Sequence, residues 1–111
     1  MKRDLTLFLE DILNSINLIE RYTKSMDMSS LEKNNKVQDA VARRIEIIGE
    51  AVKNLSTTFR NKYPKVPWKE MASMRDILIH AYFGIKLERV WNVIKNELPK
   101  VKKQIKEILE K

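Results

Sequence analysis

Residues 4–24 read DLTLFLEDILNSINLIERYTK, and this stretch carries the clearest structural pattern in the chain. Its apolar side chains recur every three or four residues, the spacing that places them on one face of an α-helix. The residues on that face are Leu5, Phe8, Leu9, Ile12, Leu13, Ile16, Ile19 and Tyr22. Asp4 can cap the start, because its carboxylate accepts hydrogen bonds from the free amides of a first helical turn. The spacing therefore predicts an amphipathic helix over residues 4–24.

Three further helices are predicted from the same apolar spacing. The second covers residues 36–55, the third covers residues 67–82, and the fourth begins near residue 86. Residues 26–34 are expected to form a loop with part of a helical turn, and residues 56–63 a loop or a short amphipathic piece. The 111 residues include only two glycines and three prolines, too few turn-forming residues for a sheet-rich fold.

The predicted fold is therefore all-α: one domain over residues 1–111, built as an antiparallel four-helix up-and-down bundle. Pro99 falls inside the last helix and is expected to kink it near this position, since proline has no amide hydrogen for the helical ladder. Gly49 falls inside the second helix, where glycine costs about 1 kcal/mol relative to alanine. We expect another helix to approach closely at Gly49, because that contact would offset the cost.

The composition excludes several classes of site. The chain has no cysteine, so disulfides, thiolate metal sites and thiol nucleophiles are excluded. It has one histidine, so a multi-histidine metal site within one protomer is excluded as well, and we expect neither a metal nor a cofactor. No apolar run approaches the 18 residues of a membrane span, and no signal-peptide core follows the charged start. We therefore expect a cytoplasmic protein without a membrane partner, which the lack of cysteine permits.

The formal net charge of +7 is concentrated in one half of the chain. Residues 1–55 contain nine Lys and Arg against nine Asp and Glu, whereas residues 56–111 contain thirteen against six. A basic surface attracts polyanions such as RNA through long-range electrostatics and counterion release. The alternative is a lysine-rich helix face that only keeps the protein soluble.

The basic half also contains the motif RDILIHAY at residues 75–82. A helix turns about 100° per residue, so Asp76 and His80 share a face and the carboxylate can hold the imidazole. Arg75 and His80 are about 140° apart, so one helix does not easily aim both at one point. Two copies of the helix packed about a two-fold axis would bring two arginines and two histidines into one groove, which predicts a homodimer.

Such a groove suits metal-independent cleavage of RNA. The ribose 2′-OH attacks the adjacent phosphorus, His80 acts as general acid or base, and Arg75 clamps the phosphate. Asp76 would orient His80, and Tyr82 could contact RNA by stacking or hydrogen bonding. Spacing alone leaves other interpretations open: His80 as a core or interface histidine satisfied by Asp76, and Tyr82 as a packing residue.

The likeness to a known family extends well beyond this motif. The chain resembles the HepT branch of the HEPN superfamily over roughly residues 5–108, in the order and spacing of several segments. These are residues 38–60 (QDAVARRIEIIGEAVKNLSTTFR), residues 64–68 (PKVPW), residues 74–84 (MRDILIHAYFG), Val90-Trp91 and Leu98-Pro99.

The resemblance implies a dimeric helical bundle acting as the metal-independent endoribonuclease toxin of a prokaryotic toxin–antitoxin pair. Arg75 and His80 match the family's catalytic Arg-x4-6-His motif, and Asp76 occupies the supporting position after the arginine, where the superfamily often has Asn. Tyr82 matches the tyrosine that the cognate antitoxin, an MntA-like minimal nucleotidyltransferase, modifies with AMP. The added bulk and negative charge would oppose RNA binding.

Two other functions remain as alternatives. The chain could be a non-catalytic helical partner or substrate-binding subunit of a minimal nucleotidyltransferase, with the basic half holding a nucleotide or partner. It could also bind nucleic acid without turnover, in which case RNA binding would depend steeply on salt without forming products.

Overall fold

The computed structural model describes residues 3–80 and 87–111, and the side chains of residues 76–80 lie outside that description. Within these ranges the chain is all-α, as predicted, and has no strand. The long helices are α1 (Arg3–Thr23), α3 (Asn35–Lys53), α5 (Trp68–His80) and α7 (Leu98–Leu109), and the shorter ones are α2 (Met28–Glu32), α4 (Thr57–Asn61) and α6 (Leu87–Asn92). A π-helical turn, η1 (Val93–Glu97), joins α6 to α7.

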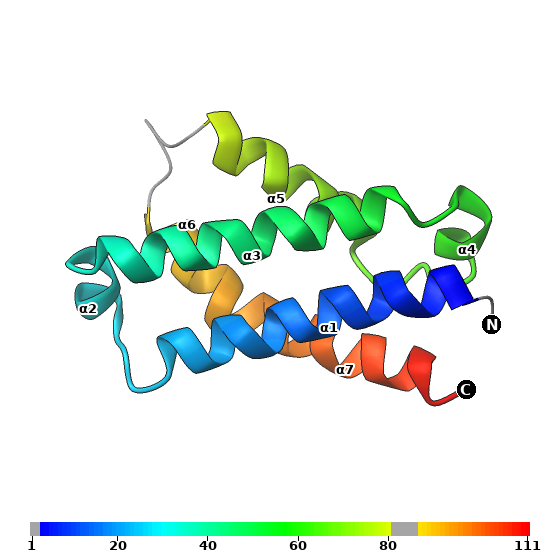
Figure 1. The fold of residues 1–111 in the computed structure, drawn as a ribbon, viewed down its shortest axis with the longest axis horizontal. Coiled ribbons are helices and arrows are strands. Elements are labelled where there is room, and N and C mark those ends of the chain that lie inside the picture. The colour runs from blue at the N-terminus through cyan, green and yellow to red at the C-terminus, as the bar shows by residue number, and fades with distance from the viewer. Residues whose placement is uncertain (1–2, 81–86) are drawn as a thin grey trace.

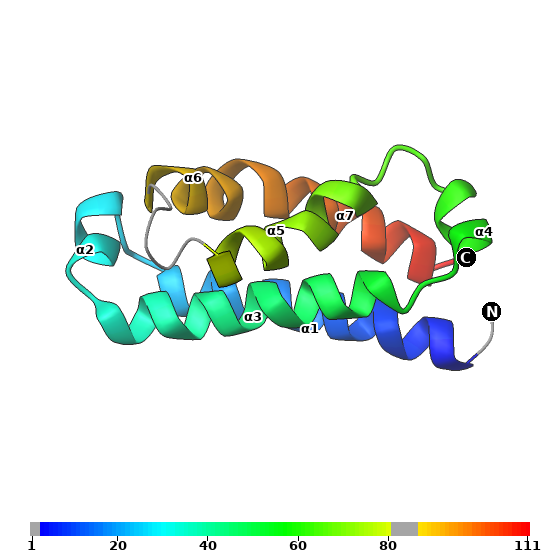
Figure 2. The same cartoon turned by 90° about the horizontal axis from the view of Figure 1, so that it is seen from above.

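The long helices pack side by side around one core. In Figure 1, α1 and α3 run along the molecule in opposite directions, with α5 along the far side of α3 from α1. Figure 2 shows that α6 and α7 form a second layer behind α1 and α3. Fully buried residues from α1, α3 and α7 meet between these layers, which removes their apolar surface from water. They include Leu9, Ile12, Ile16, Ile19, Val41, Ile45, Val52 and Ile105.

The connections contain two short helices that begin at polar caps. Asp27 precedes α2, and its Oδ1 accepts hydrogen bonds from the backbone amide of Ser30 at 2.7 Å and the hydroxyl of Ser30 at 2.8 Å. These two bonds favour the carboxylate and lower the pKa of Asp27 below its ordinary value. Ser56 caps α4 in the same manner, because its Oγ accepts from the amide of Phe59 at 3.1 Å. Residues 28–32 are thus helical where a loop with part of a turn was expected.

The helix that leads to Pro99 is not α-helical throughout. Val93–Glu97 is π-helical, and Pro99 is the second residue of α7, where its missing amide hydrogen falls in a first turn. The kink near Pro99 stays a prediction.

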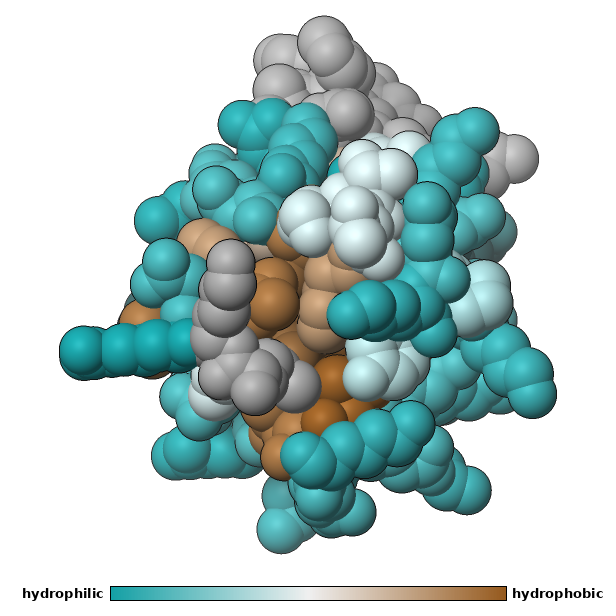
Figure 3. Space-filling model, turned by 90° about the vertical axis from the view of Figure 1, so that its right-hand side faces the viewer, coloured by the Kyte–Doolittle hydropathy of each residue, from teal (hydrophilic) through white to brown (hydrophobic). Residues whose placement is uncertain are grey.

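The start of α1 at Arg3, the C-terminus and α4 lie at one end of the molecule, opposite α2 (Figure 1). Figure 3 faces that end: hydrophobic side chains show in a hollow at its centre, and hydrophilic side chains surround them. In the described ranges no helix combines the length and apolar character that crossing a membrane requires.

Candidate active site

The predicted phosphate-binding residue, Arg75, lies where α5 crosses α3. The crossing is centred on Gly49: a Cβ atom at this position would lie 2.7 Å from the Cβ of Arg75 and 3.4 Å from the carbonyl oxygen of Met71. A real side chain cannot occupy that space, so only glycine lets the two helices come this close. The predicted close approach at Gly49 is confirmed, and the helix it admits is the one that carries the motif.

A carboxylate lies beside Arg75, and the sequence alone did not predict it. Glu50, the residue after Gly49, places its Oε1 3.8 Å from the Nε of Arg75. The Arg75 side chain is 29% exposed and that of Glu50 is 47% exposed, although the Nε of Arg75 itself is buried. At this exposure the pair has little effect on stability, but it limits the directions in which the guanidinium can point. The two residues are 25 positions apart, and only the helix crossing brings them together.

The other predicted site residues fall at or beyond the edge of the described part. Asp76 and His80 belong to α5, so their backbone follows the helix, but their side chains lie outside the described residues. Tyr82 lies outside the described residues entirely. Along α5 the backbone of His80 is about 7.5 Å beyond that of Arg75 and about 140° around the axis. The roles of Arg75, His80, Asp76 and Tyr82 therefore stay predictions.

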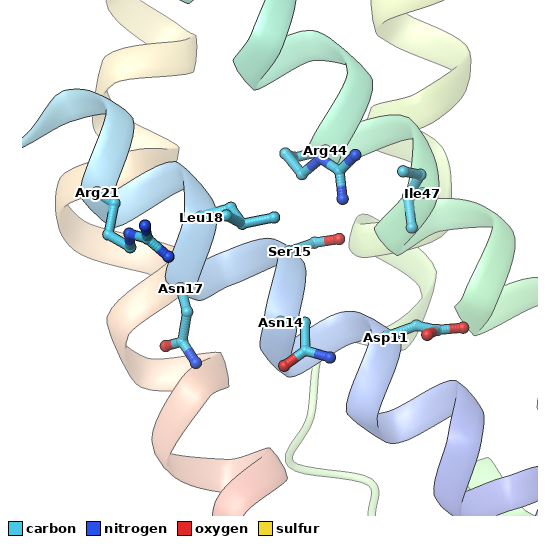
Figure 4. Close-up of a pocket in the computed structure, with 8 residues that line it drawn as sticks. All are labelled: Asp11, Asn14, Ser15, Asn17, Leu18, Arg21, Arg44 and Ile47. Atoms are coloured by element: carbon cyan, nitrogen blue, oxygen red, sulfur yellow. The ribbon is translucent and has the colours of Figure 1, made fainter.

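A second feature lies on another face of α3, where a polar groove of about 500 Å³ runs between α1 and α3. Figure 4 shows the side chain of Arg44 and the hydroxyl of Ser15 turned into the space between the two helices, with Arg21 beside Asn17 farther along α1. Arg44 is about 140° around α3 from Gly49, so this groove does not include the Arg75 crossing. Its lining residues come from two helices, and no local spacing marks them in the sequence.

Comparisons with known proteins agree with the resemblance of the sequence. The family model Ribonuclease HepT-like matches residues 12–108, which include the whole motif at residues 75–82. A protein of Methanocaldococcus jannaschii named "Gamma-glutamylcyclotransferase and putative RNase" is 52% identical over 110 residues, covering 99% of this chain and 50% of that protein. The chain thus spans about half the length of that relative.

A second relative is similar over most of both chains. A "Probable ribonuclease HepT" of Thermococcus cleftensis is 45% identical over 102 residues, covering 92% of this chain and 93% of that protein. No solved structure matches the chain.

Proposed function

Because the chain belongs to the HepT-like ribonuclease family, we propose that it is a metal-independent endoribonuclease that cleaves RNA at a composite Arg/His site in a dimer groove. The family match over residues 12–108 carries this proposal, since it spans the helices that build the candidate site. The position of Arg75 supports it. The Arg75 side chain is 29% exposed, while the helix that carries it is held against Gly49.

The proposed reaction needs no nucleophile from the protein. The ribose 2′-oxygen forms a bond to phosphorus, and the bond between phosphorus and the 5′-oxygen breaks. One His80 accepts the 2′ proton and a second His80 donates a proton to the leaving oxygen. Arg75 stabilises the negative charge that grows on the phosphate oxygens, and Asp76 orients His80. Each chain has one histidine, so the homodimer supplies the acid–base pair.

The proposed biological setting is a prokaryotic toxin–antitoxin pair in the cytoplasm. The chain would be the toxin, and an MntA-like nucleotidyltransferase would neutralise it by adding AMP to Tyr82. The bulk and negative charge of that group would keep RNA away from Arg75. The proposal includes an antiparallel four-helix up-and-down bundle with a kink of the last helix near Pro99. The opposed directions of α1 and α3 and the π-helical turn before Pro99 are consistent with that arrangement.

The test uses purified protein, a mixture of tRNA and mRNA, and an excess of chelator. We expect the unchanged protein to cleave RNA, and Arg75→Ala and His80→Ala to abolish cleavage while the helical circular dichroism spectrum is retained. Arg89→Ala is the matched control, because Arg89 is an exposed arginine on α6 that is not part of the motif. Intact RNA with the unchanged protein would refute the catalytic proposal. It would favour the non-catalytic partner of a nucleotidyltransferase if nucleotide transfer by the complex were unaffected by His80→Ala.

A further inference from the structure

A basic hollow lies at the corner where α4 leads into α5, and neither the motif nor the comparisons account for it. It is an open hollow of about 550 Å³, and its lining contains three cations, Arg60, Lys65 and Lys69, against one carboxylate, Glu70. Its volume is within the range of pockets that bind small molecules or a part of a larger ligand. The excess of positive charge favours an anion.

The backbone around the hollow is fixed by buried contacts. Trp68 is 6% exposed, and its indole Nε1 donates to the carbonyl oxygens of Tyr63 at 3.0 Å and Arg60 at 3.2 Å. The loop is also tied to α7, because Nε2 of Gln104 donates to the carbonyl oxygen of Lys65 at 3.1 Å. The backbone that carries the three cations is therefore held in place without a ligand, which lowers the entropic cost of binding.

The three cations are not paired with carboxylates of the described residues. Within the described part of the chain, Arg60, Lys65 and Lys69 have no carboxylate partner within ion-pair distance. The Nη2 of Arg60 makes only a long contact of 3.4 Å with the Thr57 hydroxyl, and its buried Nε has no hydrogen-bond partner among the described residues. A guanidinium with so few partners is suited to bind phosphate oxygens, since charge-assisted hydrogen bonds of this kind are strong.

The hollow is aligned with the predicted catalytic histidine along α5. Lys69 and His80 are eleven residues apart, so their backbone positions lie within about 20° around the helix axis and about 16 Å apart along it. Ser73 and Asp76 occupy the same face between them. A nucleic-acid strand that follows this face from His80 would reach the hollow a few nucleotides from the scissile bond.

We propose that this corner hollow binds a backbone phosphate of the RNA substrate at a distance from the cleaved bond. Arg60, Lys65 and Lys69 contact that phosphate. The inference rests on the proposed ribonuclease function and adds a substrate-binding site to it. Its consequence is that affinity for RNA depends on substrate length. A dinucleotide is too short to span about 16 Å from His80 and cannot use the hollow.

The test compares Lys65→Gln/Lys69→Gln with Lys100→Gln/Lys103→Gln, which removes the same charge from exposed positions of α7. Binding of a labelled single-stranded RNA of about twelve nucleotides is measured by fluorescence anisotropy at several salt concentrations. We expect the hollow variant to bind roughly tenfold more weakly, with a shallower salt dependence, and the α7 variant to change binding by less than about twofold. Arg60→Gln should weaken binding in the same way. Equal losses in both double variants would show a general charge effect and overturn the proposal.

Cleavage assays separate this inference from the function on which it rests. The hollow variant should have a higher KM for the RNA of about twelve nucleotides and unchanged kcat/KM for a dinucleotide. If the unchanged protein cleaves no RNA but RNA binding still depends on Lys65 and Lys69, the ribonuclease proposal is refuted and the proposed phosphate site is supported. If the unchanged protein cleaves RNA but RNA binding does not depend on Lys65 or Lys69, the proposed phosphate site is refuted and the ribonuclease proposal is retained.

Discussion

Replacing Gly49 by alanine is the most direct test of how the fold positions Arg75. Before any relaxation, the added methyl carbon would lie 2.7 Å from the Cβ of Arg75, whereas carbon atoms in contact are about 3.5–4.0 Å apart. The nearest atom is a Cβ next to the α5 backbone rather than the end of a flexible side chain, so α5 itself must move. A shift of about 1 Å would relieve the overlap.

Two opposing terms set the effect of Gly49→Ala on stability. Alanine is favoured over glycine within a helix by about 1 kcal/mol, and overpacking of a close contact costs typically about 1–3 kcal/mol. The free energy of unfolding should therefore fall by roughly 0–2 kcal/mol, and the protein should still fold. Activity should suffer far more, because a misplacement of about 1 Å in a catalytic group can reduce the rate about 100-fold.

The assay pairs urea unfolding with RNA cleavage for Gly49→Ala and for Lys36→Ala, a substitution to alanine at an exposed position of α3. We expect both variants to fold, and only Gly49→Ala to lose most of its cleavage activity. A Gly49→Ala variant with normal stability and full activity would refute the argument that this crossing holds Arg75 in place.

Three further predictions concern stability. Asp27→Asn keeps an oxygen for the α2 cap but cannot titrate. The pKa of Asp27 is lower in the folded state than in the unfolded chain. The ionised Asp27 therefore stabilises the folded protein at pH values above its unfolded pKa of about 4, and this stabilisation is lost as the pH falls through the lower folded pKa. The variant should therefore show a slightly weaker loss of stability on acidification, and identical pH profiles would contradict this. Ile105→Ala, at a fully buried position, should reduce the free energy of unfolding by about 2–5 kcal/mol in urea; a loss under about 1 kcal/mol would mean that the core repacks around the site. The ion pair of Lys102 with Glu20 joins α7 to α1 at 2.7 Å, but both side chains are partly exposed, so a double-mutant cycle should give a coupling energy below about 1 kcal/mol.

The helices could be predicted from the sequence because their signal is local. Apolar residues on one face of residues 4–24 specify both the helix and the side it buries, and the structure places Leu9, Ile12, Ile16 and Ile19 in the core. The short helix α2 could not be predicted in this way, because five residues are too few to show a period. Its stability depends on the Asp27 cap and on burial of Leu31 against the rest of the fold.

The candidate site also has features that could be predicted from the sequence and features that could not. The motif at residues 75–82, the family resemblance and the close approach at Gly49 could all be read from the chain, since each depends on residue type and spacing. Periodicity states which face of a helix is buried, but not which helix covers it. The ion pair of Arg75 with Glu50 and the gathering of Arg60, Lys65 and Lys69 around one hollow were therefore decided only by tertiary structure, through the α3–α5 crossing and the buried Trp68 corner.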